Sequence, residues 1–212
     1  MLNSKITKLP NLIILFILMF FPYFLSQAQK PGEYFDSDAI IKFRNKKNID
    51  FKKEDSPLLA ETRKDFTGLK YYEPIAKFCV KARYTELKKK DTIDFATSKK
   101  EKTKKFLRFG KFSFSIDGKD YELFAYLYLA GKNKNELFLP FTDLTNEDET
   151  YHGGRYLDIE ISKGEENYII DFNYAYNPLC SYNPKFTCPL VPLENHVKQK
   201  ILAGEKLFLN DN

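Results

Sequence analysis

The sequence has few of the residues that most often do nucleophilic or metal chemistry: its 212 residues include two histidines, three cysteines and no tryptophan. A Cys–His or Ser–His catalytic pair could therefore be built only around His152 or His196. The nine glycines do not fall in the spacing of either nucleotide-binding fingerprint, which argues against a phosphate-binding loop. The cysteine and histidine spacings match no standard zinc pattern. We therefore expect no metal and no cofactor.

Long apolar runs are absent after the N-terminal segment. Lys5 and Lys8 precede an apolar run over residues 12–21, and the tripeptide at residues 26–28, Ser-Gln-Ala, has small residues where a signal peptidase reads. The run is shorter than the roughly 20 residues that a membrane-spanning helix needs. We expect residues 1–28 to be a secretory signal peptide of a periplasmic or secreted protein that is not inserted in the membrane after cleavage. An uncleaved anchor is the alternative.

The remaining chain, residues 29–212, has a length typical of one domain. Aromatic residues make up 16% of the sequence, so Phe and Tyr should supply much of the core. Basic residues gather over residues 42–108 and acidic residues over 109–212, which indicates either a solvated lysine-rich face or a surface for an acidic polymer or anionic envelope. Nucleic acid is not expected as a partner, because no basic run is interleaved with stacking aromatics.

Helical spacing of apolar residues occurs near both ends of the mature chain. Ile40 and Phe43 belong to a pattern that predicts an N-terminal amphipathic helix beginning near Asp36. Pro192 suits the first turn of a C-terminal helix, and Gly204 suits its C-terminal cap. We expect one helix at each end of the domain.

Period-two alternation between these segments predicts strands. Residues 77–84 have one apolar face, Asp117-Gly118 marks a hairpin, and residues 121–130 are apolar on both faces, as in a central strand. Residues 155–161 and 167–172 read as a further hairpin. About seven strands with short turns predict an α+β domain on an antiparallel sheet, curled or barrel-like, with the two terminal helices.

A polar loop before residue 155 offers the first candidate site. Asp143, Thr145 and Tyr151 stand among further acidic residues, and the loop ends at Gly153-Gly154. Carboxylates near an arginine could do acid and base work or hold a hard cation, although the spacing does not fit an EF-hand. A tight acidic turn explains the same residues.

Arg155 begins the strand that follows this loop. Alternation places Arg155, Leu157 and Ile159 on one face, and Tyr156 and Asp158 on the other. A buried guanidinium needs partners, which we expect to be Asp171 and Asn173 of the second hairpin strand. Its fork could bind a carboxylate or phosphate ligand. The alternative is a structural Arg–Asp pair that binds nothing.

A second polar cluster covers residues 171–178. Asp171, Asn173, Tyr176 and Asn177 combine short hydrogen-bonding side chains with an aromatic ring, which suits a sugar or another polar ligand. A loop held by its own side-chain hydrogen bonds would use the same residues.

The cysteines suggest a cross-link. Cys180 and Cys188 bracket a proline-rich loop, and in an exported protein we expect them to form a disulfide. A thiolate metal site is the alternative. Cys79 is left over and is interpreted as a half-buried thiol.

The motifs GGRYLD, DFNYAYNP, CSYN, CPL, EN and AGEK in the C-terminal half resemble those of the DUF1684 family. The resemblance covers roughly residues 56–206 and implies a domain without an established activity. The polar residues that it implies as shared are Asp143, Thr145, Tyr151, Arg155, Asp158, Asp171, Asn173, Asn177, Cys180, Cys188, Glu194 and Asn195.

Two functions agree with these patterns. The first is an exported binding module for a small polar or anionic ligand. The second is a hydrolase in which Asp143, Asp158 or Asp171 acts as acid or base while Arg155 stabilises charge. The candidate ligand-binding residues are Asp143, Thr145, Tyr151, Arg155, Asp158, Asp171, Asn173, Tyr176 and Asn177.

Overall fold

The computed structural model describes residues 33–131, 135–146 and 148–208. The expected signal peptide over residues 1–28 lies outside these ranges, as does Glu147 of the acidic loop. Within the ranges, no helix is both long and apolar enough to cross a bilayer. The elements are α1 (Ser37–Phe51), α2 (Ala60–Lys64), η1 (Ala76–Phe78), β1 (Cys79–Glu86), β2 (Thr92–Ala96), β3 (Thr103–Ile116), β4 (Lys119–Tyr128), β5 (Glu136–Asp143), β6 (Arg155–Glu160), β7 (Asn167–Asp171), η2 (Phe172–Tyr174), η3 (Leu179–Ser181), η4 (Leu193–Asn195) and β8 (His196–Val197).

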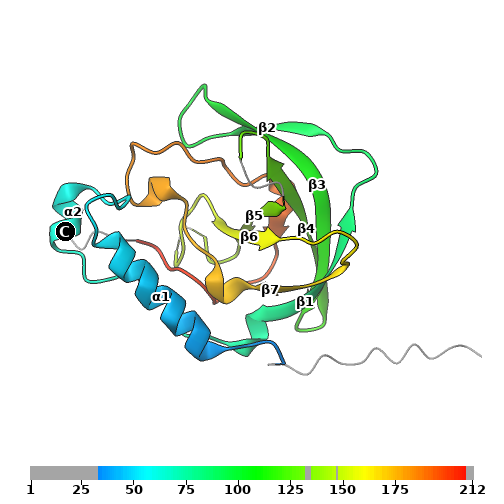
Figure 1. Cartoon of the computed structure of the whole chain (residues 1–212), viewed down its shortest axis with the longest axis horizontal. Helices are drawn as coiled ribbons and strands as arrows, with labels where there is room; N and C mark the ends of the chain where they lie inside the picture. The colour runs from blue at the N-terminus through cyan, green and yellow to red at the C-terminus, as the bar shows by residue number, and fades with distance from the viewer. Residues whose placement is uncertain (1–32, 132–134, 147, 209–212) are drawn as a thin grey trace, which may run out of the picture.

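The strands form one curled, mostly antiparallel sheet, an eight-stranded half-barrel (Figure 1). The neighbours run in the order β6-β5-β4-β3-β1-β7, while β2 pairs with β3 and β8 pairs in parallel with β5. This confirms the expected antiparallel, curled sheet, with one strand more than the seven estimated. Helices α1 and α2 lie to one side of the sheet.

The hairpin between β3 and β4 forms where the sequence predicts it. Asp117 and Gly118 have φ angles of 51° and 72°, and Ile116 pairs with Lys119 across the turn. Strand β4 is covered on both faces, as expected: Leu123 and Ala125 are fully buried in the main core, whereas Tyr126 is fully buried in a second cluster.

A bulge in β3 decides which face its aromatic residues use. The register shifts between Arg108 and Gly110, so Phe112 points into the main core while Phe106 joins the cluster on the opposite face. A Cβ at Gly110 would lie 2.4 Å from the Tyr84 ring, which explains the glycine. The bulge therefore gives the outer face of the sheet a wall of aromatic rings.

The predicted hairpin between β6 and β7 is wrong. Strand β6 pairs with β5, and β7 pairs with β1, so the two strands stand at opposite ends of the sheet order. The connection between β6 and β7 bonds to different neighbours at its two ends. The N–H of Ile161 donates to the carbonyl of Asn135 at 2.7 Å, and the carbonyl of Glu166 accepts from the N–H of Tyr84 at 2.7 Å. Alternation identifies each strand but does not identify its partner.

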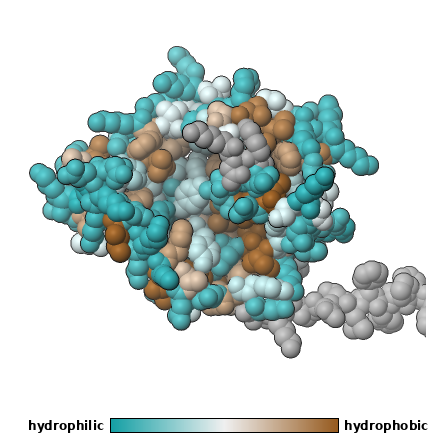
Figure 2. All heavy atoms as spheres, viewed as in Figure 1, coloured by the Kyte–Doolittle hydropathy of each residue, from teal (hydrophilic) through white to brown (hydrophobic). Residues whose placement is uncertain are grey.

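Helix α1 occupies the segment where apolar spacing predicts a helix. Its N-cap is Asp36, whose side chain accepts a hydrogen bond from the backbone of Ala39 at 2.9 Å. The buried face contains Ile40 and Arg44, whereas Phe43 is exposed. Hydrophilic side chains cover much of this side of the molecule, with small hydrophobic groups between them (Figure 2).

The predicted C-terminal helix is wrong. Pro192 precedes only the three-residue turn η4, after which the chain forms β8 and then runs without an α-helix to Phe208, the last described residue. Asn195 is fully buried and donates to the carbonyls of Phe124 and Pro140 at 2.8 and 2.7 Å. These tertiary bonds tie the segment to the sheet and override its helical spacing.

Candidate functional site

The two faces of β6 carry different chemistry. Arg155 is fully buried and Leu157 nearly so, on the face directed into the barrel. Tyr156 and Asp158 lie on the opposite face and line a surface pocket. The predicted alternation of this strand is confirmed, and it separates the candidate residues into an interior network and an open pocket.

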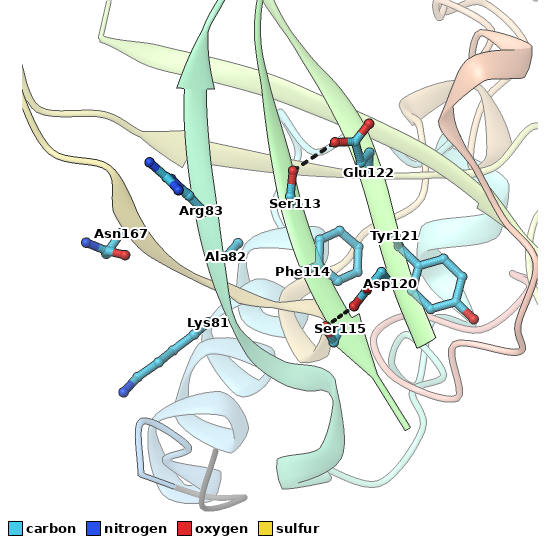
Figure 3. A pocket seen from close by; sticks show the side chains of 10 residues that line it. All are labelled: Lys81, Ala82, Arg83, Ser113, Phe114, Ser115, Asp120, Tyr121, Glu122 and Asn167. Carbon is cyan, nitrogen blue, oxygen red and sulfur yellow. Dashed lines mark hydrogen bonds between the residues drawn. The ribbon is translucent and has the colours of Figure 1, made fainter. Parts of the chain in front are cut away.

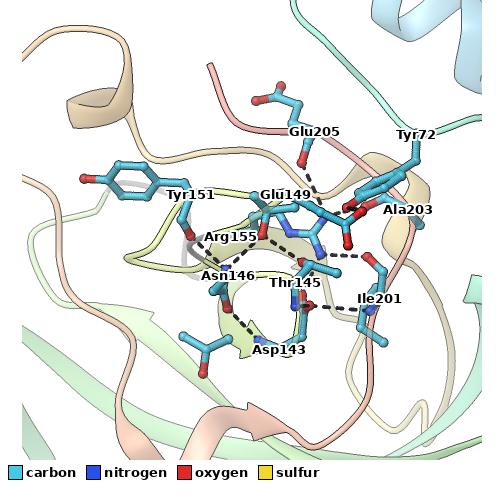
Figure 4. A network of polar contacts seen from close by, with 12 residues as sticks. Tyr72, Asp143, Thr145, Asn146, Glu149, Tyr151, Arg155, Ile201, Ala203 and Glu205 are labelled. Carbon is cyan, nitrogen blue, oxygen red and sulfur yellow. Dashed lines mark hydrogen bonds and ion pairs between the residues drawn. The ribbon is translucent and has the colours of Figure 1, made fainter. Parts of the chain in front are cut away.

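The guanidinium of Arg155 is enclosed by acceptors (Figure 4). Its Nη2 donates to Asp143 Oδ2 at 2.6 Å and to the carbonyl of Ile201 at 2.9 Å. Its Nη1 donates to the carbonyls of Ala203 and Glu205. The expected partners Asp171 and Asn173 are not among these acceptors. The guanidinium is 0% exposed and pairs with Asp143, which agrees with the structural alternative left open by the sequence; among the described residues its buried Nε has no hydrogen-bond partner.

The loop after β5 closes on itself. The backbone N–H of Thr145 donates to Asp143 Oδ1 at 2.7 Å, and the hydroxyls of Thr145 and Thr150 lie 2.8 Å apart. Asn146 donates to the carbonyl of Tyr151 at 2.8 Å. Asp143 and Thr145 are buried, so these hydrogen bonds organise the loop and hold the carboxylate against Arg155.

Asp171 and Asn173 form a separate network at the end of β7. Asp171 Oδ1 accepts from the backbone and side chain of Asn173, at 2.9 and 2.7 Å. The Asn173 amide also exchanges two hydrogen bonds of 3.0 Å with the backbone of Ile75. Burial raises the pKa of Asp171, and the Asn173 contacts oppose that rise. This cluster caps η2 and does not meet Arg155.

Asn177 holds the C-terminal segment in place. Its backbone N–H donates to Glu205 Oε2 at 3.0 Å, and its side chain donates to the carbonyl of Lys206 at 2.8 Å. Glu205, only 1% exposed, also receives hydrogen bonds from Lys47 and Tyr182. Glu205 belongs to the AGEK motif, but nothing in its local sequence pattern predicts that this carboxylate is buried.

A pocket with a volume of about 490 Å³ opens on the outer side of β6. Its walls come from β3, β4, β5, β6 and the segment over residues 176–189. The lining residues are Lys104, Phe106, Tyr128, Gly131, Glu136, Phe138, Tyr156, Asp158, Tyr176, Pro178, Leu179, Phe186, Thr187, Cys188 and Pro189.

Aromatic rings form a continuous wall of this pocket. Phe106 stacks on Phe138 with centroids 5.3 Å apart, and Phe138 meets Tyr156 edge to face at 4.6 Å. Tyr156 in turn meets Tyr176 at 5.8 Å and 90°. Phe106 and Phe138 were missed as site residues. The sequence signal that could have identified them is an apolar residue at a position where the alternation of the strand directs the side chain outward.

Asp158 is the carboxylate within this wall. The hydroxyl of Tyr176 donates to its Oδ2 at 2.5 Å. Desolvation raises the pKa of Asp158, the Tyr176 hydrogen bond opposes that rise, and the negative charge of Glu136 adds to it. Burial, followed by the charge of Asp158, raises the pKa of Tyr176 well above its usual range. The side chain of Asp158 is nevertheless exposed within the pocket.

Cys180 and Cys188 are free thiols in the structure, so the predicted disulfide is not formed in it. The loop does bring them together, because the backbone N–H of Cys180 donates to Cys188 Sγ at 3.0 Å. The Tyr151 hydroxyl lies 3.6 Å from Cys180 Sγ. Cys79 is partly buried, as expected, and burial raises its pKa to about 12.

A second hollow, of about 590 Å³, lies over β1, β3 and β4 (Figure 3). Its carboxylates already pair with neighbouring hydroxyls: Ser113 donates to Glu122 at 3.0 Å, and Ser115 donates to Asp120 at 2.5 Å. Most of its polar side chains point to solvent. Among the described residues, no group of three or more His, Cys, Asp or Glu side chains is arranged to hold a metal ion.

Comparisons with known proteins agree with this architecture but supply no activity. A model of the family described as "Protein of unknown function (DUF1684)" matches residues 64–206. The fold is similar to the solution NMR structure of an uncharacterised protein from Haloarcula marismortui, with a TM-score of 0.63 and 33% identity over 80% of this chain and 92% of that one. No curated protein matches the sequence. Both the interior network and the pocket fall within the matched residues.

Proposed function

The chain belongs to the DUF1684 family, and from the geometry of its pocket we propose that it is a binding module for a small, hydroxyl-bearing ring compound of the sugar type. The observation that carries the proposal is a cavity of about 490 Å³ with aromatic walls and two accessible carboxylates, Asp158 and Glu136. Cavities of this size with few, well-placed polar groups are typical of small-molecule sites.

The chemistry of the walls favours this ligand class. Aromatic faces pack against the apolar C–H face of a sugar ring. Asp158 Oδ2 already receives the Tyr176 hydroxyl, and among the described residues the structure gives Oδ1 no donor, so it can accept a hydrogen bond from a ligand hydroxyl. Among the described residues, the lining contains the two carboxylates Glu136 and Asp158 and one cation, Lys104, a balance that disfavours an anionic ligand.

Export is part of the proposal. Lys5, Lys8 and the apolar run over residues 12–21 support it. Export is tested by locating the protein in host fractions and measuring its mass. Recovery from the envelope or medium with cleavage after Ala28 supports export, and an intact N-terminus with a cytoplasmic location contradicts it.

A thermal-shift screen tests the binding function, with neutral mono- and disaccharides in one arm and carboxylates and phosphates in the other. A ligand at about 100 times its dissociation constant should add roughly 2.7 kcal/mol to the native state. Asp158→Asn should weaken sugar binding by about tenfold to a hundredfold, since a hydrogen bond to a charged group contributes roughly 1.5–3 kcal/mol.

The matched control is Glu160→Gln, which removes one charge from the same strand outside the pocket. No shift with any sugar, or equal affinity in the Asp158 variant, would contradict the proposal.

A carboxylate-dependent glycoside hydrolase is the second candidate. Of the three carboxylates considered from the sequence, Asp143 and Asp171 are tied into interior networks, while Asp158 lines the pocket with a raised pKa. A raised pKa suits a general acid, and Glu136 would be the second carboxylate. Release of nitrophenol from aryl glycosides, lost in Asp158→Asn and in Glu136→Gln but kept in Glu160→Gln, would support catalysis over binding alone.

A further inference from the structure

The two cysteines at the edge of the pocket form a pair that the ligand-binding proposal does not use. Cys180 lies in η3, Cys188 follows eight positions later, and the N–H of Cys180 donates to Cys188 Sγ at 3.0 Å. Both are free thiols in the structure. The short separation comes from the turn that η3 makes beside the extended segment near Pro189.

The two sulfurs differ in accessibility. Cys180 is partly exposed, whereas Cys188 is only 6% exposed. A reagent from solution therefore reaches Cys180 first, and Cys188 stands behind it as a second thiol.

The surroundings also favour a thiolate at Cys180. The hydrogen bond from Cys188 lowers the pKa of Cys180 to about 6, although burial acts to raise it. The Tyr151 hydroxyl, 3.6 Å from Cys180 Sγ, also lowers this pKa. The hydrogen bond that Cys188 donates to Cys180, together with burial, raises the pKa of Cys188. Lys104 and Tyr156 are the other ionisable groups that face the pair.

We propose that Cys180 and Cys188 form a redox-active dithiol that exchanges with small-molecule disulfides of the glutathione type. The Cys180 thiolate attacks one sulfur of the small disulfide, forms a mixed disulfide and releases one small thiolate. Cys188 then loses its proton, attacks the Cys180 sulfur and releases the second small thiolate. The protein pair loses two electrons, and the small disulfide gains them as two thiols.

Cys79 supplies an internal control. It begins β1, where it pairs with Asp171 of β7, and burial followed by the charge of Asp171 raises its pKa to about 12. Cys79 is partly buried, as Cys180 is, but its raised pKa keeps it in the thiol form, which is a poor nucleophile for exchange. The proposal therefore predicts that one pair out of three cysteines reacts, and it does not depend on the identity of any ligand in the pocket.

Equilibration of the purified protein with glutathione buffers of graded ratio, followed by acid quenching, alkylation and peptide mass spectrometry, tests the exchange. The expected result is a reversible change between two alkylated cysteines and a peptide cross-linked through Cys180 and Cys188. Cys188→Ser should accumulate a mixed disulfide of glutathione at Cys180, whereas Cys180→Ser should accumulate none.

Three free thiols at every ratio, or a cross-link that no glutathione ratio reduces, would overturn the proposal; the second result would identify a structural disulfide.

The pH profile of alkylation separates a reactive thiol from a merely exposed one. At pH 5.5 an ordinary thiol with a pKa near 8.5 is almost fully protonated, whereas Cys180 keeps a larger thiolate fraction. Cys180 should therefore react roughly ten times faster than a cysteine in a short peptide, even though a thiolate of lower pKa is intrinsically less nucleophilic. Tyr151→Phe keeps the ring and removes the hydroxyl, and should move the midpoint of the profile to higher pH. A midpoint for Cys180 near that of the peptide would contradict the role assigned to it.

Discussion

The two faces of a single strand, β6, present polar side chains in environments that differ in solvent exposure. On the barrel side, Arg155 is bound by one carboxylate and three backbone carbonyls and has no contact with solvent. On the pocket side, Asp158 receives a single hydroxyl and remains exposed. Buried charges must be paired to be tolerated, whereas an accessible carboxylate keeps bonding capacity for a ligand. The difference agrees with a structural role for the barrel face and supports the binding proposed for the pocket face.

Arg155→Ala should give the largest effect. It leaves the Asp143 carboxylate and the carbonyls of residues 201–205 buried without their donor, and should lower the free energy of unfolding by about 3–5 kcal/mol in a urea titration. The control is Arg83→Ala, which breaks an exposed pair with Glu166 at 3.2 Å and should cost less than about 1 kcal/mol. Equal costs for the two variants would remove the distinction between the faces of β6.

Gly204→Ala should disturb the same network through the backbone. Gly204 has a φ of +76°, and a Cβ there would lie 2.6 Å from the carbonyl oxygen of Ala175. Left-handed strain together with this clash should cost about 2–4 kcal/mol, measured by thermal or urea unfolding. Gly164→Ala is the matched control, because φ is +82° with open space around the Cβ; it should cost only the strain, about 1–2 kcal/mol. Equal losses would show that the packing around Gly204 is not tight.

Asp158→Asn and Asp143→Asn should have opposite outcomes at neutral pH. The folded-state pKa of Asp158 is raised from its ordinary value of 3.8, so its stabilising contribution is present when it is protonated and is lost as the pH rises through the folded pKa. The Asn variant should therefore match or slightly exceed wild-type stability at pH 7, by less than about 1 kcal/mol because the group is partly exposed.

The same comparison at acidic pH checks the sign. The advantage of Asp158→Asn should disappear below about pH 4. Asp143→Asn, in contrast, removes the charge that pairs with Arg155 and should destabilise the protein at neutral pH. Similar losses in both variants would show that Asp158 is as structural as Asp143.

Tyr176→Phe should act chiefly on the titration of Asp158. It keeps the ring that packs on Tyr156 and removes the hydroxyl that donates to Asp158. Because that hydrogen bond lowers the pKa of Asp158, the variant should titrate at higher pH in an NMR measurement of the carboxyl carbon, with a stability loss of about 1 kcal/mol. Tyr121→Phe, which removes a hydroxyl bonded to Gln199, should leave the Asp158 titration unchanged.

The features predicted correctly from the sequence are local ones. The Asp117-Gly118 turn, the two covered faces of β4 and the opposite orientations of Arg155 and Asp158 follow from positive φ preference and period-two alternation. The β6–β7 hairpin and the C-terminal helix fail because strand pairing and the bonds of Asn195 depend on residues distant in the sequence.

The candidate site shows the same division. Residue types in two polar segments pointed to one shared site, whereas the structure separates them into the Arg155 network, the Asp171 cluster and the pocket beside Asp158. Phe106 reaches the pocket only because the bulge near Gly110 turns its side of β3 outward. Spacing along the chain does not specify such a contact.

The sequence alone determined most of the strands, the Asp117-Gly118 turn, the family resemblance and the requirement that Arg155, on the apolar face of its strand, be paired. Tertiary structure decided which carboxylate pairs with it and that Asp158 rather than Asp143 or Asp171 lines an open cavity. The physical reason is that turn preference and alternation act between near neighbours, whereas burial and hydrogen-bond partners are fixed by elements brought together from across the sheet.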